Sequence, residues 1–328
     1  MIITRAPFRV SFCGGGSDLP SFYEKYGGCV LSTTIRKYMY LTLHNYFYKD
    51  QIVLKYSKTE CVNDYSEIEH KIFKQVLKDF DIKGVEISSM ADIPAGTGLG
   101  SSSTFTVALL QLLHTYKEEY ITKYKLAKDA CSVEIEKLGE PIGKQDQFAA
   151  SFGGLKFYKF FNNGFVDVEP VIMNKSSYKK LEDRLMMFYL GGTHSASEIL
   201  KEQSANFTDK NKVKIQMKMC DIAQTLKEEL QKNNVDAMGG LLHENWLLKK
   251  SLASGISNPK IDEIYNKAIN AGATGGKLLG AGGSGFMLFY VPETKQDSVR
   301  NVLSGLNETK FEIDNSGSSI IYIDKDFG

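Results

Sequence analysis

The stretch from Pro94 to Ser103 contains the residue types that most directly indicate chemistry. It reads Pro-Ala-Gly-Thr-Gly-Leu-Gly-Ser-Ser-Ser, and its alternating glycines allow the backbone to approach a ligand closely. The serines begin a long apolar segment, so the free N–H groups and the dipole of a helix would point at the loop. This pattern is typical of a phosphate-binding loop, although a glycine-rich turn with a serine N-cap would also fit. No Gly-Lys-Ser/Thr ends the loop, so it is not a Walker A loop.

Two further glycine loops occur far away in the sequence. Cys13–Asp18 follows an expected strand, and its aspartate could accept hydrogen bonds from sugar hydroxyls or simply cap a turn over residues 19–26. Gly280–Gly285 lies between two expected strands; because no helix follows, it does not match the dinucleotide-binding fingerprint, whereas a bulged hairpin would fit. Three such loops in one chain indicate a cleft in which the backbone meets a polyanion.

Carboxylates supply the remaining chemistry. Asp146, in the segment Gly143–Phe148, could accept a proton from a substrate hydroxyl if a cation keeps it ionised. Glu134 and Glu136 lie upstream on an expected helix, and carboxylate oxygen suits Mg²⁺. Without the glycine loops, these residues would fit an ordinary solvated charged face.

The elements that must position these residues form a mixed α+β chain. We expect strands near residues 9–13, 39–47, 51–56, 85–90 and 155–160, and helices near 68–80, 102–116 and 122–138. The second half favours helices near 195–203, 212–232, 235–251 and 259–271, then strands near 277–279, 285–291, 310–313 and 320–323. Because strands and helices do not alternate, a doubly wound parallel sheet is disfavoured. We predict two lobes, residues 1–180 and 181–328.

The composition limits the partners. The 328 residues include 40 basic and 39 acidic ones, and the net charge of +1 disfavours nucleic acid bound by bulk charge. The five scattered cysteines indicate neither disulfides nor a zinc site. We see no signal peptide and no apolar run of membrane-spanning length, so we expect a cytoplasmic protein without a membrane partner.

The three loops together resemble those of the GHMP kinase superfamily, which includes galactokinase and mevalonate kinase. The first motif is Arg5–Val10 running into Gly14–Asp18, the second is Pro94–Ser102 and the third is Leu279–Gly285. These motifs span nearly the whole chain. The resemblance implies a first lobe like ribosomal protein S5 domain 2, a ferredoxin-like second lobe, and a site between them.

Within the superfamily, Phe12–Pro20 and Gly139–Gln147 resemble the bacterial D-glycero-D-manno-heptose 7-phosphate kinases. L-fucokinase-like domains share a similar Gln-Asp-Gln signature and are the nearest alternative. Gly15-Gly16 stands where galactokinases have Glu-His, which argues against galactose as the substrate. The resemblance implies Mg-ATP and transfer of the γ-phosphoryl group to the anomeric C1 hydroxyl of a sugar phosphate, giving a 1,7-bisphosphate for nucleotide-heptose synthesis. The protein would be a monomer or a homodimer.

The resemblance also assigns roles to individual residues. Asp146 matches the catalytic base, Arg9 its cationic partner, and Ser102 with Glu136 the metal ligands, Glu134 being the alternative to Glu136. The residues expected at the ATP phosphates are Pro94, Gly96, Thr97, Gly98, Leu99, Gly100, Ser101 and Ser102. The residues expected at the substrate are Gly15, Gly16, Ser17, Asp18, Lys144, Thr193, Gly282 and Gly283.

Two questions stay open at this stage. His194 stands where related kinases commonly have an arginine, so another cation would have to bind a distal phosphate, with Lys144, Lys277, Arg36 and Lys37 as candidates. A sensor that keeps the fold without turnover is the second hypothesis. Catalysis is favoured over it because Asp146, Arg9 and Ser102 are all present.

Overall fold

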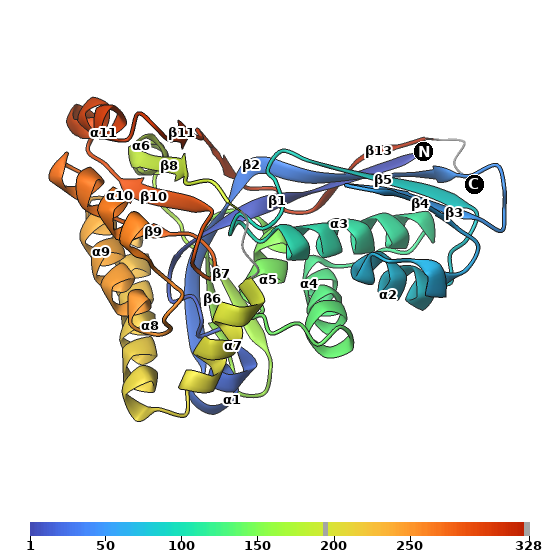
Figure 1. Ribbon diagram of the computed structural model, residues 1–328, viewed down its shortest axis with the longest axis horizontal. Coiled ribbons are helices and arrows are strands. Elements are labelled where there is room, and N and C mark those ends of the chain that lie inside the picture. The colour runs from blue at the N-terminus through green and yellow to red at the C-terminus, as the bar shows by residue number, and fades with distance from the viewer. Residues whose placement is uncertain (193–195, 325–328) are drawn as a thin grey trace.

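The structure is a computed structural model that describes residues 1–192 and 196–324. Within these residues, the strands form a nine-stranded sheet and a four-stranded sheet, each packed against helices. Figure 1 shows the long sheet extending toward both chain termini, with the smaller sheet at the opposite end of the molecule. The predicted α+β class and two-lobed arrangement are confirmed. No helix in the described part of the chain is both long and apolar enough to cross a membrane.

The larger sheet is built around two long antiparallel strands, β1 (Ile2–Cys13) and β2 (Gly28–Asn45). Both are rich in β-branched and aromatic residues, which favour extended backbone. Their register shifts between Pro7 and Arg9, next to a proline that lacks an N–H for the ladder. Five further strands of this sheet follow before the second lobe begins: β3 (Ile52–Lys55), β4 (Thr59–Val62), β5 (Val85–Ala91), β6 (Lys156–Phe160) and β7 (Val166–Pro170).

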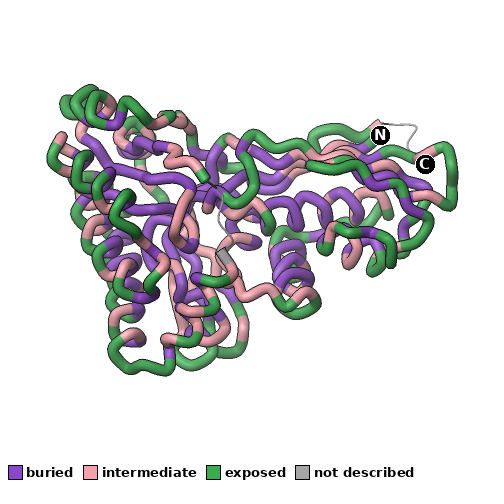
Figure 2. Tube along the Cα trace, in the orientation of Figure 1, coloured by how far each residue is buried: buried purple, intermediate pink, exposed green. Residues whose placement is uncertain are grey.

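Helices cover one face of this sheet. The apolar helix α3 (Ser101–Tyr116) packs against β1 and β2, which is why it is apolar over most of its surface. Figure 2 shows α3 and the strands above it largely buried, whereas the loops at the far end are exposed. The other helices of this lobe are α1 (Pro20–Tyr26), α2 (Lys71–Phe80), α4 (Lys123–Cys131), α5 (Gln145–Phe152) and a 3₁₀ turn at Tyr65–Glu67.

The smaller sheet has the ferredoxin-like arrangement. Its strands β8 (Leu185–Tyr189), β9 (Gly275–Leu278), β10 (Phe286–Tyr290) and β11 (Asn307–Glu308) lie in the antiparallel order β11-β8-β10-β9. Helices connect β8 to β9 and β10 to β11, which gives the βαββαβ pattern. These helices are α7 (Ala196–Asn206), α8 (Lys210–Gln231), α9 (Ala237–Lys250), α10 (Pro259–Asn270) and α11 (Gln296–Val302), with α6 (Lys175–Arg184) before β8 and a 3₁₀ turn at Glu293–Lys295.

The two lobes are not separated by a single cut in the sequence. The last strands, β12 (Ile313–Asp314) and β13 (Ser319–Ile323), pair with β2 and β1 in the larger sheet, although we placed residues 313–323 in the second lobe. One hydrophobic core also joins the lobes, because it contains Leu99 of the first and Leu279 and Phe286 of the second. The lobes therefore share a continuous interior.

Two helices differ from the sequence-based expectation. The helix expected over residues 122–138 ends at Cys131 and continues as a π-helical turn, Ser132–Lys137, a feature often found at functional sites. Helix α5 was not expected as an element, and it begins at Gln145. Its eight residues carry Asp146 in their first turn.

The second and third glycine loops pack against each other through their backbones. A Cβ atom at Gly98 would lie 2.4 Å from the carbonyl oxygen of Leu279, and one at Gly285 would lie 2.3 Å from that of Thr97. Such distances leave no room for a side chain. The glycines therefore let the two lobes approach closely at the level of their loops.

This contact gives a stability prediction. A methyl group at Gly280 would lie 2.5 Å from the Cα of Gly98, and Gly280 has a φ of +82°. We expect Gly280→Ala to lower the free energy of unfolding, measured by urea titration, by roughly 1–3 kcal/mol. The matched control Gly240→Ala adds a methyl in helix α9 where nothing lies within 4 Å, and it should raise that free energy by roughly 0.5–1 kcal/mol. Equal effects of the two substitutions would contradict the described loop packing.

Candidate active site

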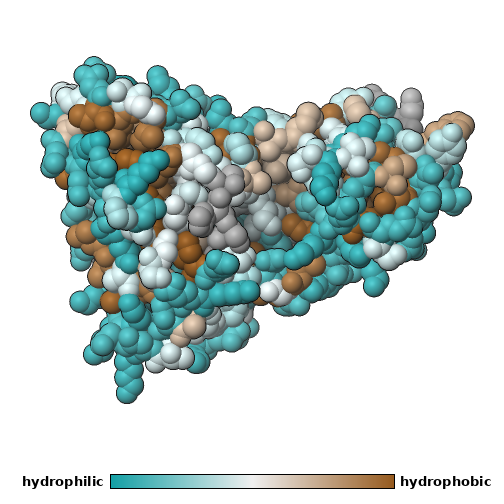
Figure 3. All heavy atoms as spheres, in the orientation of Figure 1, coloured by the Kyte–Doolittle hydropathy of each residue, from teal (hydrophilic) through white to brown (hydrophobic). Residues whose placement is uncertain are grey.

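A cavity of about 560 Å³ lies where the lobes meet. All three glycine loops contribute to its wall, through Gly15 and Gly16, through Ala95, Gly96, Gly98 and Gly100–Ser103, and through Leu279, Gly280, Ala281, Gly282 and Ser284. Figure 3 shows hydrophilic side chains over much of the visible face, with apolar side chains in separate patches. The loops that are distant in sequence therefore line one site.

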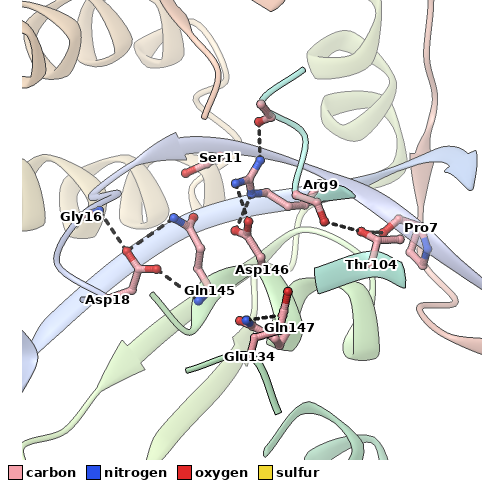
Figure 4. A network of polar contacts seen from close by, with 12 residues as sticks. Pro7, Arg9, Ser11, Gly16, Asp18, Thr104, Glu134, Gln145, Asp146 and Gln147 are labelled. Carbon is pink, nitrogen blue, oxygen red and sulfur yellow. Dashed lines mark hydrogen bonds and ion pairs between the residues drawn. The ribbon is translucent and has the colours of Figure 1, made fainter. Parts of the chain in front are cut away.

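An ion pair between a buried arginine and a half-buried aspartate forms the centre of this site. The Nε and Nη2 atoms of Arg9 donate to the two carboxylate oxygens of Asp146, each at 2.7 Å. The third guanidinium nitrogen, Nη1, donates to the carbonyl oxygen of Gly98 at 2.6 Å. Arg9 is 6% exposed. Figure 4 shows how Arg9 from β1 and Asp146 from α5 point toward each other beneath the second glycine loop.

Two helix N-termini face the cavity around this pair. Gly100, with a φ of +77°, is the N-cap of α3, and the free N–H groups of the first turn follow at Ser101 and Ser102. Asp146 lies in the first turn of α5, where a negative charge is favourable to the helix dipole. A side chain at Gly100 would come within 3.1 Å of Oδ2 of Asp146. Glycine at this position therefore keeps the approach to that carboxylate open.

Asp18 holds the first glycine loop against α5. Its Oδ1 accepts from the backbone N–H of Gly16 at 2.9 Å and from Nε2 of Gln145 at 3.4 Å, and its Oδ2 accepts from the N–H of Gln145 at 3.2 Å. The residue is 3% exposed. Burial, and next the charge of Asp146, raise the pKa of the Asp18 carboxyl. Asp18 also lines the cavity, so it both shapes the loop and forms part of the cavity wall.

The structure pairs Ser102 with Glu134, not with Glu136. Ser102 Oγ donates to Oε1 of Glu134 at 2.6 Å, and Nε2 of Gln147 donates to Oε2 at 2.7 Å. Glu134 is fully buried, and burial raises the pKa of its carboxyl to about 7. Glu136, our first choice for a metal ligand, is exposed and accepts a hydrogen bond from Ser132, so Glu134, the alternative, is the glutamate that the structure places beside Ser102. The π-helical turn at Ser132–Lys137 changes which side chains face α3.

Several other predicted residues do not face the cavity. Lys144 Nζ donates to the carbonyl oxygen of Gly164 at 3.0 Å and lies over the ring of Tyr23, so it does not contact a ligand in the cavity. Ser17 is buried, and its hydroxyl bonds to the backbone of Cys29.

Other predicted positions support the loops from behind. Gly283 donates its N–H to Ile256, and Pro94, Thr97 and Leu99 do not line the cavity. Thr97 Oγ1 donates to the carbonyl oxygen of Pro94. The predicted residue Thr193, together with His194, lies outside the described residues.

The cavity also contains residues that the sequence analysis did not assign. Gln145, next to Asp146, was visible only as part of the Gln-Asp-Gln sequence. The centroid of the His70 ring lies 4.9 Å from that of the Tyr56 ring and 5.0 Å from that of the Phe105 ring. All three residues line the cavity. No local motif marks these aromatic residues, because each comes from a different element.

The comparisons with known proteins agree with this geometry. The family model described as the GHMP kinases N terminal domain matches residues 67–154, and the GHMP kinases C terminal model matches residues 226–311. The chain is 32% identical to the D-glycero-alpha-D-manno-heptose 7-phosphate kinase of Campylobacter jejuni over 90% of this chain and 91% of that protein. It is 26% identical to the L-fucokinase/L-fucose-1-P guanylyltransferase of Bacteroides fragilis, over 90% of this chain and 35% of that protein.

A solved structure extends the similarity to the whole fold. The crystal structure of a D-glycero-D-manno-heptose 1-phosphate kinase from Bacteroides thetaiotaomicron matches with a TM-score of 0.81 and 26% identity, covering 99% of this chain and all of that one. Both family models, the overall fold and the three glycine loops around one cavity point to the same conclusion. The chain is a kinase that belongs to the GHMP family.

Proposed function

We propose that this protein transfers the γ-phosphoryl group of ATP to the anomeric C1 hydroxyl of D-glycero-D-manno-heptose 7-phosphate. The observation that carries the proposal is the Arg9–Asp146 pair at the N-terminus of α3. It brings a cation and a carboxylate to the end of a loop whose backbone suits phosphates. The names of the relatives from Campylobacter jejuni and Bacteroides thetaiotaomicron support a heptose phosphate as the acceptor.

The phosphates of ATP fit the loop between Gly96 and Ser102. Free N–H groups at the start of α3 and the dipole of that helix favour negative charge there. Gly98 and Gly100 have φ values of +84° and +77°, which orient successive backbone groups without side chains in the way. This end of the cavity continues to the aromatic residues Tyr56 and His70, where an adenine base could stack.

Ser102 and Glu134 fit a magnesium ion. A hydroxyl and a carboxylate oxygen 2.6 Å apart are hard oxygen donors of the kind that would hold Mg²⁺ together with phosphate and water oxygens. Bound there, Mg²⁺ would neutralise charge on the phosphates. Gln147 holds the other carboxylate oxygen and so fixes the orientation of Glu134.

The cavity also has polar groups that suit a molecule rich in hydroxyl groups. Ser11, Gln145 and Ser284 each have a buried side-chain oxygen with no hydrogen-bond partner in the structure, and each lines the cavity. Polar atoms of this kind need partners, which sugar hydroxyls would supply. Gly15 leaves room for the sugar beside Ser11 and Gln145, whereas Gly16 packs against Gln203 and Gln216.

The chemical step follows from this placement. The acceptor oxygen attacks the γ-phosphorus, the bond from that phosphorus to the bridging oxygen breaks, and ADP leaves with that oxygen. The hydroxyl proton passes to the carboxylate of Asp146, which Arg9 holds in a fixed orientation. Arg9 and the N–H groups of α3 stabilise the charge that develops on the transferred phosphoryl group.

The substrate assignment is tested by ADP release with Mg-ATP and a panel of acceptors. We expect turnover with D-glycero-D-manno-heptose 7-phosphate and little or none with fucose, galactose or mevalonate. Turnover with fucose alone would keep the proposed mechanism but replace the acceptor. Binding of ATP without turnover of any acceptor would favour a sensor instead of an enzyme.

The role of Asp146 predicts a loss in the chemical step. Asp146→Ala should lower kcat by roughly two to four decades, because it removes the base and the partner of Arg9. Asp146→Asn keeps the shape of the side chain, so it is the variant expected to disturb folding least. Circular dichroism checks the folding of both variants. A loss of less than about tenfold in a well-folded variant would rule out the general-base role.

Glu134 and Glu136 form a matched pair for testing the metal site. Glu134→Gln should raise the Mg²⁺ concentration for half-maximal activity by at least about tenfold, because it removes the carboxylate next to Ser102. Glu136→Gln should leave this concentration unchanged, since Glu136 is exposed and bonds only to Ser132 among the described residues. The reverse pattern would restore Glu136 as the ligand.

A further inference from the structure

We propose that Lys249 and Lys277 form an anion site in the same cavity, which binds the phosphate group that the acceptor already carries. The inference rests on the proposed function, because it concerns the end of the acceptor away from the transferred phosphoryl group. It names the residues that would select a sugar phosphate over a neutral sugar. Lys249 lies outside the sequence motifs on which the resemblance to the GHMP kinases rests.

Both lysines are buried and extend from the second lobe, Lys249 to the first glycine loop and Lys277 to the strand before it. They lie on α9 and β9, are 6% and 5% exposed, and line the cavity. Lys249 Nζ donates to the carbonyl oxygen of Gly15 at 3.3 Å and to Oε1 of Gln203 at 2.8 Å. Lys277 Nζ donates to the carbonyl oxygen of Ser11 at 2.7 Å. An ammonium group has three N–H donors, so donors remain for a ligand.

The charges around these lysines do not balance. The oxygens that they contact belong to neutral groups, and neither forms an ion pair with a carboxylate in the part of the chain that the structure describes. Asp146 is already paired with Arg9. Asp18 is the one buried carboxylate among the described cavity residues, and its charge acts on Lys249.

Buried positive charges without a counter-ion are unfavourable. Taking an ammonium group out of water costs several kcal/mol unless an opposite charge compensates. Burial lowers the pKa of Lys249 to about 8, and burial lowers that of Lys277 to about 7. A bound phosphate dianion would supply the missing charge and accept the remaining N–H donors, which explains why two lysines are kept at this place.

The position of the lysines separates this site from the site of ATP. Their backbone acceptors, Ser11 and Gly15, belong to the first loop and the strand before it, whereas the ATP phosphates fit the N-terminus of α3. The other cations considered from the sequence do not compete. Lys144 contacts Gly164, and Arg36 pairs with Glu312 at the surface; neither lines the cavity.

Calorimetric titration of the intact protein tests the site. Lys249→Met should weaken the binding of D-glycero-D-manno-heptose 7-phosphate by roughly 10–100-fold, the effect expected of a charge-assisted hydrogen bond. The preference of Lys249→Met for the phosphorylated sugar should fall by a similar factor. This preference is the dissociation constant of the unphosphorylated heptose divided by that of the 7-phosphate. Lys277→Met is a second variant with the same expectation. Lys250→Met is the matched control, because Lys250 is adjacent on α9 but pairs with Asp262.

The affinity should also depend on pH in a defined direction. Phosphate binding favours the protonated lysines, so the affinity should fall as the pH rises from 7 to 9 through their lowered pKa values. Burial raises the pKa of Cys13 to about 12, so its thiol does not produce this trend. Burial also raises the pKa of Asp18, and its ionisation would weaken anion binding in the same direction, so the comparison with Lys249→Met isolates the contribution of the lysine. The slope of the affinity against pH should be smaller in Lys249→Met than in the wild type.

The outcomes separate this inference from the proposed function. An equal loss for the phosphorylated and unphosphorylated heptose would overturn the anion site and leave the kinase assignment in place. Should the wild type bind no heptose 7-phosphate, the proposed acceptor fails, and inorganic phosphate becomes the probe. Weaker phosphate binding by Lys249→Met than by Lys250→Met would then support the anion site, and equal binding would refute it.

Discussion

The bidentate contact between Arg9 and Asp146 is the interaction on which the rest of the site depends. It joins the central strand β1 to the start of α5, and the remaining guanidinium nitrogen ties both to Gly98 of the phosphate loop. Planar, charge-assisted pairs of this kind fix orientation as well as distance. Removing Asp146 would leave the charge of the buried Arg9 uncompensated, so the pair holds the local structure together.

At the glycine loops the backbones of the two lobes lie so close that no side chain fits between them. This close approach forms the cavity. The backbone of the third loop lies directly against that of the second, while the shared core continues beneath them. The return of β12 and β13 to the larger sheet closes the chain around this junction. A ligand in the cavity therefore contacts both lobes, and small changes in the loops would change the site itself.

Most charged groups in the cavity are placed beside groups that stabilise their charge. Anions are favoured near the helix N-termini, and the carboxylates are each held by specific donors. The two buried lysines depart from this balance, because they contact only neutral oxygens. Buried ammonium groups without a carboxylate partner become more favourable when an anion binds beside them, so an anionic ligand would stabilise the folded protein.

The sequence by itself determined the fold class and the three glycine loops, and it indicated Arg9, Asp146 and Ser102 as candidate site residues, because these signals lie in short contiguous motifs. It did not determine which glutamate meets Ser102, since a π-helical turn shifts the side chains that face α3. Helix α5 is too short to give a clear period, and β13 joins the first sheet through pairing with a distant strand. Only the tertiary structure brought Lys249 beside Gly15, because their contact spans more than two hundred residues of chain and no local pattern encodes it.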